Sequence, residues 1–351
     1  MEFLSITDAS IAKAAGIIAA GGLAAFPTET VYGLGADAFN TAALAKVFAA
    51  KNRPRFDPLI IHIAAVENLG KIADLNCLSS TARERLETLA ANLWPGPLTL
   101  ILPKRSEVPD LATSGLQSAA VRIPAHSAAR KLIALAGGAV AAPSANPFGA
   151  LSPTRAEHVR DLLGEKVDII LDGGSTEVGV ESTVLDITGE RPRILRPGGV
   201  SRETIEALIG KVETAAENAA GQTPDTEAAG MVSPGRLKSH YAPRARLAVF
   251  AREDTAALPS SADGSAFLFF DGETRDKWLD GRRGAFSSAP VSPPVVKTLS
   301  EKADVIEAAA NLFQILHEID KPGIAQIYAQ LAPGHGLGAA INDRLQRAAA
   351  R

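Results

Sequence analysis

The sequence predicts an α/β protein of two domains, with a twisted, mostly parallel sheet in the first domain and a smaller α/β second domain. Two observations predict this fold. Helical patterns alternate with short apolar runs along most of the 351 residues, and this alternation is interrupted once, near residues 211–230. Alternating helices and strands are typical of parallel sheets covered by helices, and a chain of this length commonly forms two domains.

The first 210 residues contain the denser set of elements. A helix over 154–163 is expected to start with a capping box of Thr154 and Glu157 and to end at Gly164. Ser201 is the expected cap of another helix. The other predicted helices cover 11–20, 41–50 and 202–209, and the predicted strands cover 23–26, 58–64, 98–102, 121–124, 140–142, 168–171 and 183–187.

Residues 211–230 mark a change of character. They have little apolar periodicity and are rich in Ala, Glu, Thr and Gly, a composition typical of a linker. A basic segment with Pro and Gly, SPGRLKSHYAPRA, comes next. We therefore expect a first domain over 1–210, a flexible linker over 211–244 and a second domain over 245–351. The second domain is expected to contain strands 246–250, 266–270 and 324–331 and helices 303–319 and 339–349.

Composition narrows the class of protein. Hydrophobic residues make up 46% of the chain, which is ordinary for a protein with a packed core. The net charge of −3 argues against a nucleic-acid coat. The single cysteine, Cys77, excludes a disulfide framework or a cysteine-based zinc site within one chain. The sequence shows no signal-peptide pattern and no apolar run of ~18 residues, so we expect a cytoplasmic protein without membrane contact.

Polar side chains gather where a predicted strand ends. The segment PTETVYGLG follows strand 23–26 and places polar groups at a strand end, where α/β sheets usually carry their ligands. These groups are the hydroxyls of Thr28, Thr30 and Tyr32 and the carboxylate of Glu29. We expect a polar loop that leads into the helix at residue 41. A tight turn with solvated polar residues explains the same pattern, and composition alone does not separate the two.

Cations provide a second signal. Lys51, Arg53 and Arg55 stand within five residues directly after a helix, and lysine and arginine together can clamp a polyphosphate. The alternative is that they complement the carboxyl end of that helix. Arg122 and Arg196 lie in apolar runs, where a buried guanidinium needs an anionic partner. That partner is either a structural carboxylate or a ligand, and several such arginines in one domain favour a ligand.

Small polar residues follow several of the apolar strands. Serine and asparagine beside Gly or Pro can offer hydroxyl, amide and main-chain donors to a phosphate or a carboxylate, and turns or helix caps are the alternative. His62 alternates with apolar neighbours, a pattern more typical of a strand residue than of a ligand. No P-loop, G-x-S-x-G or paired-histidine zinc motif occurs in the sequence. The small polar residues in question are Ser118, Ser144, Asn146, Ser152 and Ser182.

Taken in order, these segments resemble the L-threonylcarbamoyl-AMP synthase family in its long, two-domain form. The later SPGRLKSHYAP segment and the α/β region after it resemble the family's linker and C-terminal domain. The resemblance implies a YrdC-like first domain with a concave basic face and a Rossmann-like second domain. The motifs that carry it are PTETVYGLG, KNRP, PLIIHI, WPGPLTLIL, AVRIP, APSAN, SPT, DGG, GVESTV and LRPGG.

The resemblance also implies a reaction. The family joins L-threonine, bicarbonate and ATP into threonylcarbamoyl-AMP and pyrophosphate, which makes it a nucleotidyltransferase. The product feeds the threonylcarbamoyladenosine modification of tRNA. The implied partners are therefore these substrates and a downstream tRNA-modifying threonylcarbamoyl transferase complex, with tRNA contact allowed but not required. Mg²⁺ is expected to arrive with ATP, because no set of carboxylates stands at metal-ligand spacing.

Site residues follow from the resemblance, position by position. Lys51 and Arg53 are implied as catalytic residues on the phosphates of ATP. Lys238, His240 and Tyr241 of the linker are implied to close over the nucleotide as a lid. The other implied ATP-binding residues are Arg55, Ser118, Ser144, Asn146, Ser152 and Arg196. The implied L-threonine-binding residues are Thr28 or Thr30, together with His62, Arg122, Ala142 and Ser182.

Two other functions are consistent with parts of the pattern. A module that binds RNA on a basic face, without chemistry, predicts salt-sensitive RNA affinity and no ATP turnover. The near-neutral charge and the aromatic content of 5% argue against extensive base stacking. Another carbamoyl- or adenylyl-transfer enzyme is the second alternative, and the cysteine-rich modules of carbamoyl-transferring relatives are missing from this sequence.

Overall fold

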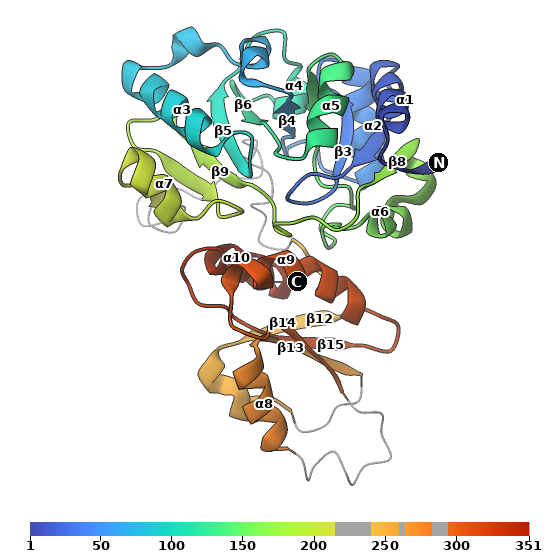
Figure 1. Ribbon diagram of the computed structural model, residues 1–351, viewed down its shortest axis with the longest axis vertical. Coiled ribbons are helices and arrows are strands. Elements are labelled where there is room, and N and C mark those ends of the chain that lie inside the picture. Colours follow the sequence, from blue (N-terminus) through green and yellow to red (C-terminus); the bar gives the residue numbers. More distant parts are fainter. Residues whose placement is uncertain (215–239, 260–263, 283–293, 351) are drawn as a thin grey trace. The chain divides into compact units, whose positions relative to one another are not determined.

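A computed structural model (Figure 1) describes residues 1–214, 240–259, 264–282 and 294–350. These residues form two compact units, one from 1–148 with 152–214 and one from 149–151 with the described residues from 240 onward. Helices and strands alternate along both units, which confirms the predicted α/β class. No helix in this described part of the chain is long and apolar enough to cross a membrane.

The first unit is built on one eleven-stranded mixed sheet, in the order β1-β8-β2-β3-β7-β4-β6-β5-β9-β10-β11. Parallel neighbours such as β4 and β6 occur beside antiparallel neighbours such as β2 and β3. Its strands are β1 (Glu2–Ser5), β2 (Ala24–Phe26), β3 (Gly33–Asp37), β4 (Ile60–Ile63), β5 (Leu98–Pro103), β6 (Ser118–Arg122), β7 (Ala139–Ala141), β8 (Ile169–Asp172), β9 (Thr183–Asp186), β10 (Arg193–Arg196) and β11 (Glu213–Thr214). Its helices are α1 (Asp8–Ala19), α2 (Thr41–Lys51), α3 (Ser80–Leu93), α4 (Asp110–Thr113), α5 (Ser127–Leu135), α6 (Ala156–Leu163) and α7 (Arg202–Ile209), with 3₁₀ turns at Val66–Lys71, Leu75–Cys77 and Gly164–Lys166.

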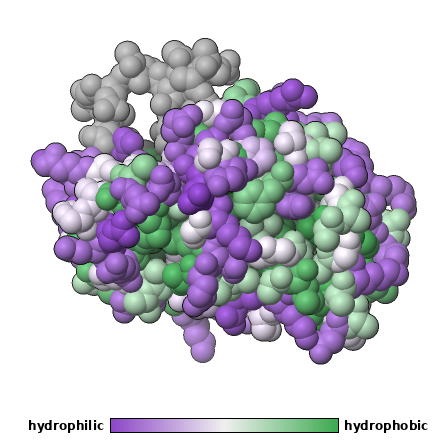
Figure 2. Space-filling model, turned by 90° about the horizontal axis from the view of Figure 1, so that it is seen from above, coloured by the Kyte–Doolittle hydropathy of each residue, from purple (hydrophilic) through white to green (hydrophobic). Residues whose placement is uncertain are grey.

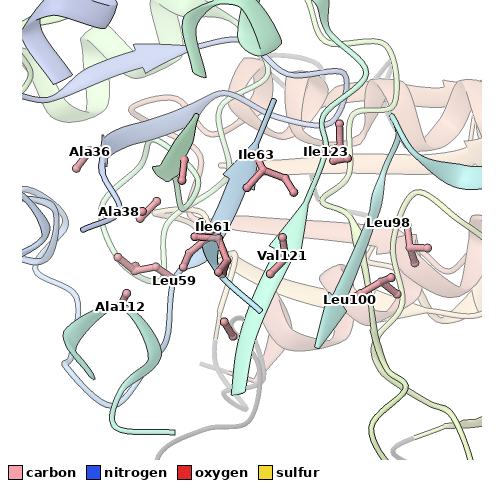
Figure 3. Packing of buried hydrophobic residues seen from close by; sticks show 14 of the residues in the cluster. Ala36, Ala38, Leu59, Ile61, Ile63, Leu98, Leu100, Ala112, Val121 and Ile123 are labelled. Atoms are coloured by element: carbon pink, nitrogen blue, oxygen red, sulfur yellow. The ribbon is translucent and has the colours of Figure 1, made fainter. Parts of the chain in front are cut away.

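The main core lies on one face of the central strands. Val121 stands opposite Ile61 on β4 and opposite Leu100 on β5, and the three side chains are fully buried in one cluster (Figure 3). The same cluster contains residues of α2, α3 and α7, such as Leu44 and Leu86. Because neighbouring residues of a strand point to opposite faces, burial of this row fixes which side chains face the other way.

Two local predictions are wrong. The polar loop expected up to helix 41 contains β3 (Gly33–Asp37), which sequence patterns missed because glycine disfavours strands. Here glycine is needed, since a Cβ on Gly35 would lie 2.6 Å from the ring of Phe26. The capping box of Thr154 and Glu157 does not form: α6 begins after Arg155, with no side-chain cap.

Other predicted boundaries hold, and several elements were not predicted. Gly164 ends α6, and the hydroxyl of Ser201 accepts from the main-chain NH of Thr204 to cap α7. The elements without a sequence prediction include α3, α5, β1 and β10. β11 (Glu213–Thr214) lies after residue 210, and Ala150 pairs with Ala242 within the second unit. The domain boundaries drawn from the sequence stay a prediction.

The second unit contains a four-stranded, all-parallel sheet in the order β12-β15-β13-β14. Figure 1 shows α9 and α10 on one face of this sheet and α8 on the other, as expected for a Rossmann-like arrangement. Aromatic side chains such as Phe267, Phe269 and Trp278 fill part of its core. Its elements are β12 (Arg246–Phe250), β13 (Ser265–Asp271), α8 (Gly272–Asp280), β14 (Val295–Ser300), α9 (Val305–Ile319), β15 (Gln326–Gln330) and α10 (Gly338–Ala349), with a 3₁₀ turn at Arg252–Ala257.

The surface is mixed in character. On the face seen in Figure 2, hydrophobic residues form small groups separated by hydrophilic ones. Such a distribution is ordinary for a folded protein, and the described residues on this face form no large apolar patch.

Candidate functional site

The site begins on the face of the central strands that points away from the main core. Where Ile61 and Val121 face that core, His62 and Arg122 face the opposite side of the sheet. His62 stands opposite Arg122 in the parallel pair β4–β6, and Thr99 stands opposite Arg122 in the antiparallel pair β5–β6. Strand register therefore sets His62, Arg122 and Thr99 side by side across three strands.

Thr99 continues this row to Ser182 and Arg196. Oγ1 of Thr99 and Oγ of Ser182 lie 2.7 Å apart. Arg196 ends β10 and donates from Nη2 to the main-chain oxygen of Ser182 at 2.9 Å and to its Oγ at 3.2 Å. Gly198 permits this close packing, because a Cβ there would lie 2.4 Å from main-chain atoms of residues 181–183.

A buried carboxylate pairs with Arg122. Nη2 of Arg122 donates to Oε1 of Glu29 at 2.6 Å, and its Nε donates to the main-chain oxygen of Gly96 at 3.2 Å. The other oxygen of Glu29 accepts from the main-chain NH of Ala125 at 3.0 Å. Of the two partners that the sequence allowed for Arg122, a structural carboxylate or a ligand, the structure shows the carboxylate of Glu29. Burial, and then the charge of Arg122, lower the pKa of His62 to about 3, so this imidazole is neutral.

The two threonines of the PTET segment are both buried but differ in their contacts. Oγ1 of Thr28 accepts from the main-chain NH of Thr30 at 3.2 Å and donates to the main-chain oxygen of Val31 at 2.7 Å. This hydroxyl therefore closes its own loop. Oγ1 of Thr30 lies 2.8 Å from Oγ1 of Thr28. Burial raises the pKa of Tyr32, whose hydroxyl donates to the main-chain oxygen of Gly174 at 2.8 Å.

Lys51 is the last residue of α2 and is only 1% exposed. Its Nζ donates to the main-chain oxygens of Ser144 and Asn146, at 2.5 Å each. These carbonyls belong to the loop after β7, and not to the last turn of α2, so complementing its own helix is not its main role. Burial, and then the charge of Arg53, lower the pKa of Lys51 well below its usual range.

Arg53 pairs with a second buried carboxylate. Its Nη2 lies 3.0 Å from Oδ2 of Asp57. Burial raises the pKa of the Asp57 carboxyl, while the charges of Arg53, Lys51 and Arg196 oppose that change. Three of the predicted cations therefore act on one buried carboxyl group. Arg196 also belongs to the row described above, so it connects the two parts of the site.

A third carboxylate joins the loops beside Lys51. Oγ of Ser152 donates to Oε1 of Glu181 at 2.5 Å, and both residues are buried. The charge of Glu181 acts on Lys51 and favours its protonated form. Nδ2 of Asn146 donates to the main-chain oxygen of Pro147 at 2.9 Å.

The other predicted residues of the first unit are spread more widely. Ala142 is buried, and its main-chain NH donates to the oxygen of Ile60 at 2.9 Å. Ser118 opens β6 and is half-buried, whereas Arg55 is exposed. Ser144 enters the site through its main-chain oxygen.

The predicted lid residues are divided. Lys238 lies outside the described residues. Tyr241 is buried in the second unit, where its ring centroid lies 5.7 Å from that of Phe313 and 5.0 Å from the guanidinium of Arg344. His240 is its neighbour and is also buried. Their contact with nucleotide stays a prediction.

Sequence reasoning assigned no role to four residues of this site: Glu29, Asp57, Thr99 and Glu181. Glu29 and Glu181 lie inside motifs that were recognised, so a search for the carboxylates that neutralise the buried cations would have found them. Asp57 and Thr99 carry no such signal, because their roles depend on chain folding. Within the described residues no three His, Cys, Asp or Glu side chains form a metal-binding group.

Comparison with known proteins finds relatives that cover almost the whole chain. Residues 16–198 match the Sua5/YciO/YrdC family, described as "Telomere recombination", and residues 200–350 match a domain described as "Threonylcarbamoyl-AMP synthase, C-terminal domain". A Threonylcarbamoyl-AMP synthase of Pyrococcus abyssi is 41% identical over 98% of this chain and 95% of its own length. The chain belongs to the threonylcarbamoyl-AMP synthase family.

Other members of the family show the same extent of similarity. The threonylcarbamoyl-AMP synthase of Bacillus subtilis is 40% identical over 99% of this chain and 94% of its own length. The crystal structure of P. abyssi Sua5 complexed with L-threonine superposes with a TM-score of 0.82 and 39% identity, covering 99% of this chain and 96% of that one. A variant of the same protein, with an adjacent histidine and tyrosine replaced by alanine, gives a TM-score of 0.80 at 37% identity.

Proposed function

We propose that this family member joins L-threonine, bicarbonate and ATP into threonylcarbamoyl-AMP and pyrophosphate. The observation that carries the proposal is a set of buried polar residues whose two parts meet at Arg196. Arg122 and His62 stand at one end of it, Lys51 and Arg53 at the other, and Arg196 acts on both parts. A site of this kind can align two anionic reactants.

The end that contains Lys51 and Arg53 suits the phosphates of ATP. A lysine offers a compact charge and an arginine a planar fork, and both bind phosphate oxygens well. Burial disfavours the charged form of Lys51, and phosphate oxygens beside it would restore that charge. We assign Arg196 and the loop residues to this nucleotide part: Ser118, Ser144, Asn146, Ser152 and, at its exposed edge, Arg55.

The end that contains Arg122 suits L-threonine, the ligand of the solved P. abyssi relative. The guanidinium can bind the amino-acid carboxylate, and the neutral imidazole of His62 can exchange a hydrogen bond with a hydroxyl or an amine. We assign Thr30, Ala142 and Ser182 to the same subsite. Thr30 is preferred over Thr28, whose hydroxyl is used within its loop.

The proposed chemistry is an in-line transfer at the α-phosphorus of ATP. The amine of threonine and bicarbonate first give an N-carboxy-threonine with loss of water. Its carboxylate oxygen then forms a bond to the α-phosphorus, and the bond to the leaving pyrophosphate breaks. Lys51, Arg53 and Arg196 stabilise the negative charge that develops, so no covalent side-chain nucleophile is needed.

Mg²⁺ fits this site as a companion of ATP. The described carboxylates near the nucleotide end are paired, Asp57 with Arg53 and Glu181 with Ser152, so phosphate oxygens and water are its expected ligands. Bound there, it would add positive charge to the leaving pyrophosphate.

We propose that the segment around His240 and Tyr241 closes the site during turnover. The support comes from the sequence: SPGRLKSHYAP lies between the two domains expected from it, and it holds the only His–Tyr pair of the chain. The P. abyssi variant with an adjacent His and Tyr replaced fits a role for such a pair. Closure would protect the labile carbamate from water.

The product would pass in the cytoplasm to the tRNA-modifying transferase.

The direct test is pyrophosphate release. The protein is incubated with ATP, L-threonine, bicarbonate and Mg²⁺, and the adenylate is sought by mass spectrometry. Pyrophosphate should form only when threonine and bicarbonate are both present. Release that ignores threonine would refute the proposal, and RNA binding without any turnover would favour the RNA-binding alternative.

A further inference from the structure

Glu29 is a buried residue of the site without a role in the reaction described above. It is 5% exposed, and its carboxylate holds Arg122 at 2.6 Å and the main-chain NH of Ala125 at 3.0 Å. Its main-chain oxygen accepts from the NH of Val178 at 2.8 Å. One residue therefore ties together the PTET loop, the end of β6 and the loop before β9.

The contacts of Arg122 show what this arrangement does. Two of its three nitrogens are held by protein groups, Nε by Gly96 and Nη2 by Glu29. Two such contacts fix the plane of a guanidinium group. Among the described residues these contacts use Nε and Nη2, so Nη1 is the nitrogen that can donate a hydrogen bond to a ligand. Since the nearby His62 is neutral, the pair of Glu29 and Arg122 also keeps the local charge balanced before any ligand binds.

We propose that Glu29 is the positioning residue of the L-threonine subsite. It fixes the guanidinium of Arg122 so that Nη1 is presented to the carboxylate of the amino acid. Glu29 acts through Arg122 and does not itself contact the substrate. This inference rests on the proposed function, in which Arg122 binds the threonine carboxylate.

The test is L-threonine binding by calorimetry, which needs no turnover. Glu29→Gln keeps the shape of the side chain and removes its charge, and we expect the Kd for L-threonine to rise about 10- to 100-fold, the loss typical when the partner that orients a metal ligand is replaced. The Kd for ATP should stay within about twofold, since Arg122 is not assigned to the phosphates. Glu2→Gln is the matched control, because Glu2 forms an exposed ion pair with Lys13 at 2.6 Å in the same unit.

A double variant shows whether Glu29 acts through Arg122. In the Arg122→Gln background, Glu29→Gln should change the threonine Kd no further, because the group it orients is gone. If either single variant does not fold because its partner charge is left unpaired, Glu29→Asp, which keeps the charge but shortens the side chain, is compared with the wild type instead, and its Kd for L-threonine should rise while its Kd for ATP does not.

Two results would overturn the inference: an unchanged threonine Kd in Glu29→Gln, or an undiminished effect of Glu29→Gln when Arg122 is already replaced. Failure of the proposed function is a different result. There, the wild-type protein would release no threonine-dependent pyrophosphate, whatever Glu29→Gln does to binding.

Discussion

Nζ of Lys51 lies 2.5 Å from the main-chain oxygen of Ser144. This contact connects the carboxyl end of α2 to the loop after β7, two segments that are far apart in the sequence. It places a buried ammonium group against carbonyl oxygens that phosphate oxygens can replace as its partners.

Replacing Lys51 tests the nucleotide part of the site. Lys51→Met removes the charge and keeps much of the side-chain volume, so kcat/KM for pyrophosphate release should fall at least ~100-fold, the loss typical of removing one charge-stabilising donor. Lys46→Met is the control, since Lys46 lies on the same helix but is exposed and donates to the main-chain oxygen of Gly21. Equal rates in the two variants would reduce Lys51 to a structural residue.

Gly198→Ala tests the close packing around Ser182. The new Cβ would lie 2.4 Å from main-chain atoms of residues 181–183, so the loop that holds Ser182 and Arg196 must move. We expect the free energy of unfolding to drop by about 1–3 kcal/mol, as in other overpacked sites, together with weaker L-threonine binding. Urea unfolding measures the first effect. Gly70→Ala is the control, because a Cβ at that position would have no neighbouring atom within 4 Å.

The pKa of His62 gives a prediction for stability against pH. In the folded protein its pKa is about 3, whereas in the unfolded chain it is ordinary, about 6.5. The unfolded chain therefore binds a proton between these values and the folded protein does not, so acidification favours unfolding. From pH 7 to pH 5 the wild type should lose about 2 kcal/mol more than His62→Gln. Equal losses in denaturant titrations would show that His62 is not neutral and buried.

Comparing Tyr241→Ala with Tyr241→Phe separates the contribution of Tyr241 to stability from its proposed role in the lid. The ring is buried beside Phe313 and Arg344, so its removal should destabilise the second unit by about 3–5 kcal/mol. Tyr241→Phe keeps the ring and should keep that stability. If Tyr241→Phe is stable but loses activity, the hydroxyl acts during turnover; if it keeps full activity, only the ring matters.

The fold was largely predictable from the sequence because its strands are short, apolar and punctuated by glycine. Strands such as β5 and β9 and helices such as α2 lie within a few residues of their predicted bounds. β3 was not predicted, since its glycines are required by neighbouring side chains that are distant in sequence. Pairing order is also non-local: β1 stands beside β8, which no local pattern indicates.

The cations of the site were predictable, but their partners were not. Lys51 and Arg53 stand out as a cluster of cations directly after a helix. Arg122 and Arg196 stand out because charge is rare in apolar segments. Which of these has a carboxylate partner depends on the fold: Arg122 pairs with Glu29 from a different loop, whereas Lys51 binds carbonyl oxygens. A sequence can therefore reveal a buried charge without revealing what neutralises it.

In the proposed reaction, one site unites threonine, bicarbonate and the α-phosphate of ATP. It is tested most directly by supplying ¹³C-labelled bicarbonate with ATP and L-threonine and recording the mass of the adenylate that forms. We expect a threonylcarbamoyl-AMP one mass unit heavier than with unlabelled bicarbonate, formed by the wild type and nearly absent with Lys51→Met. An adenylate without the label, or equal yields from both proteins, would contradict it.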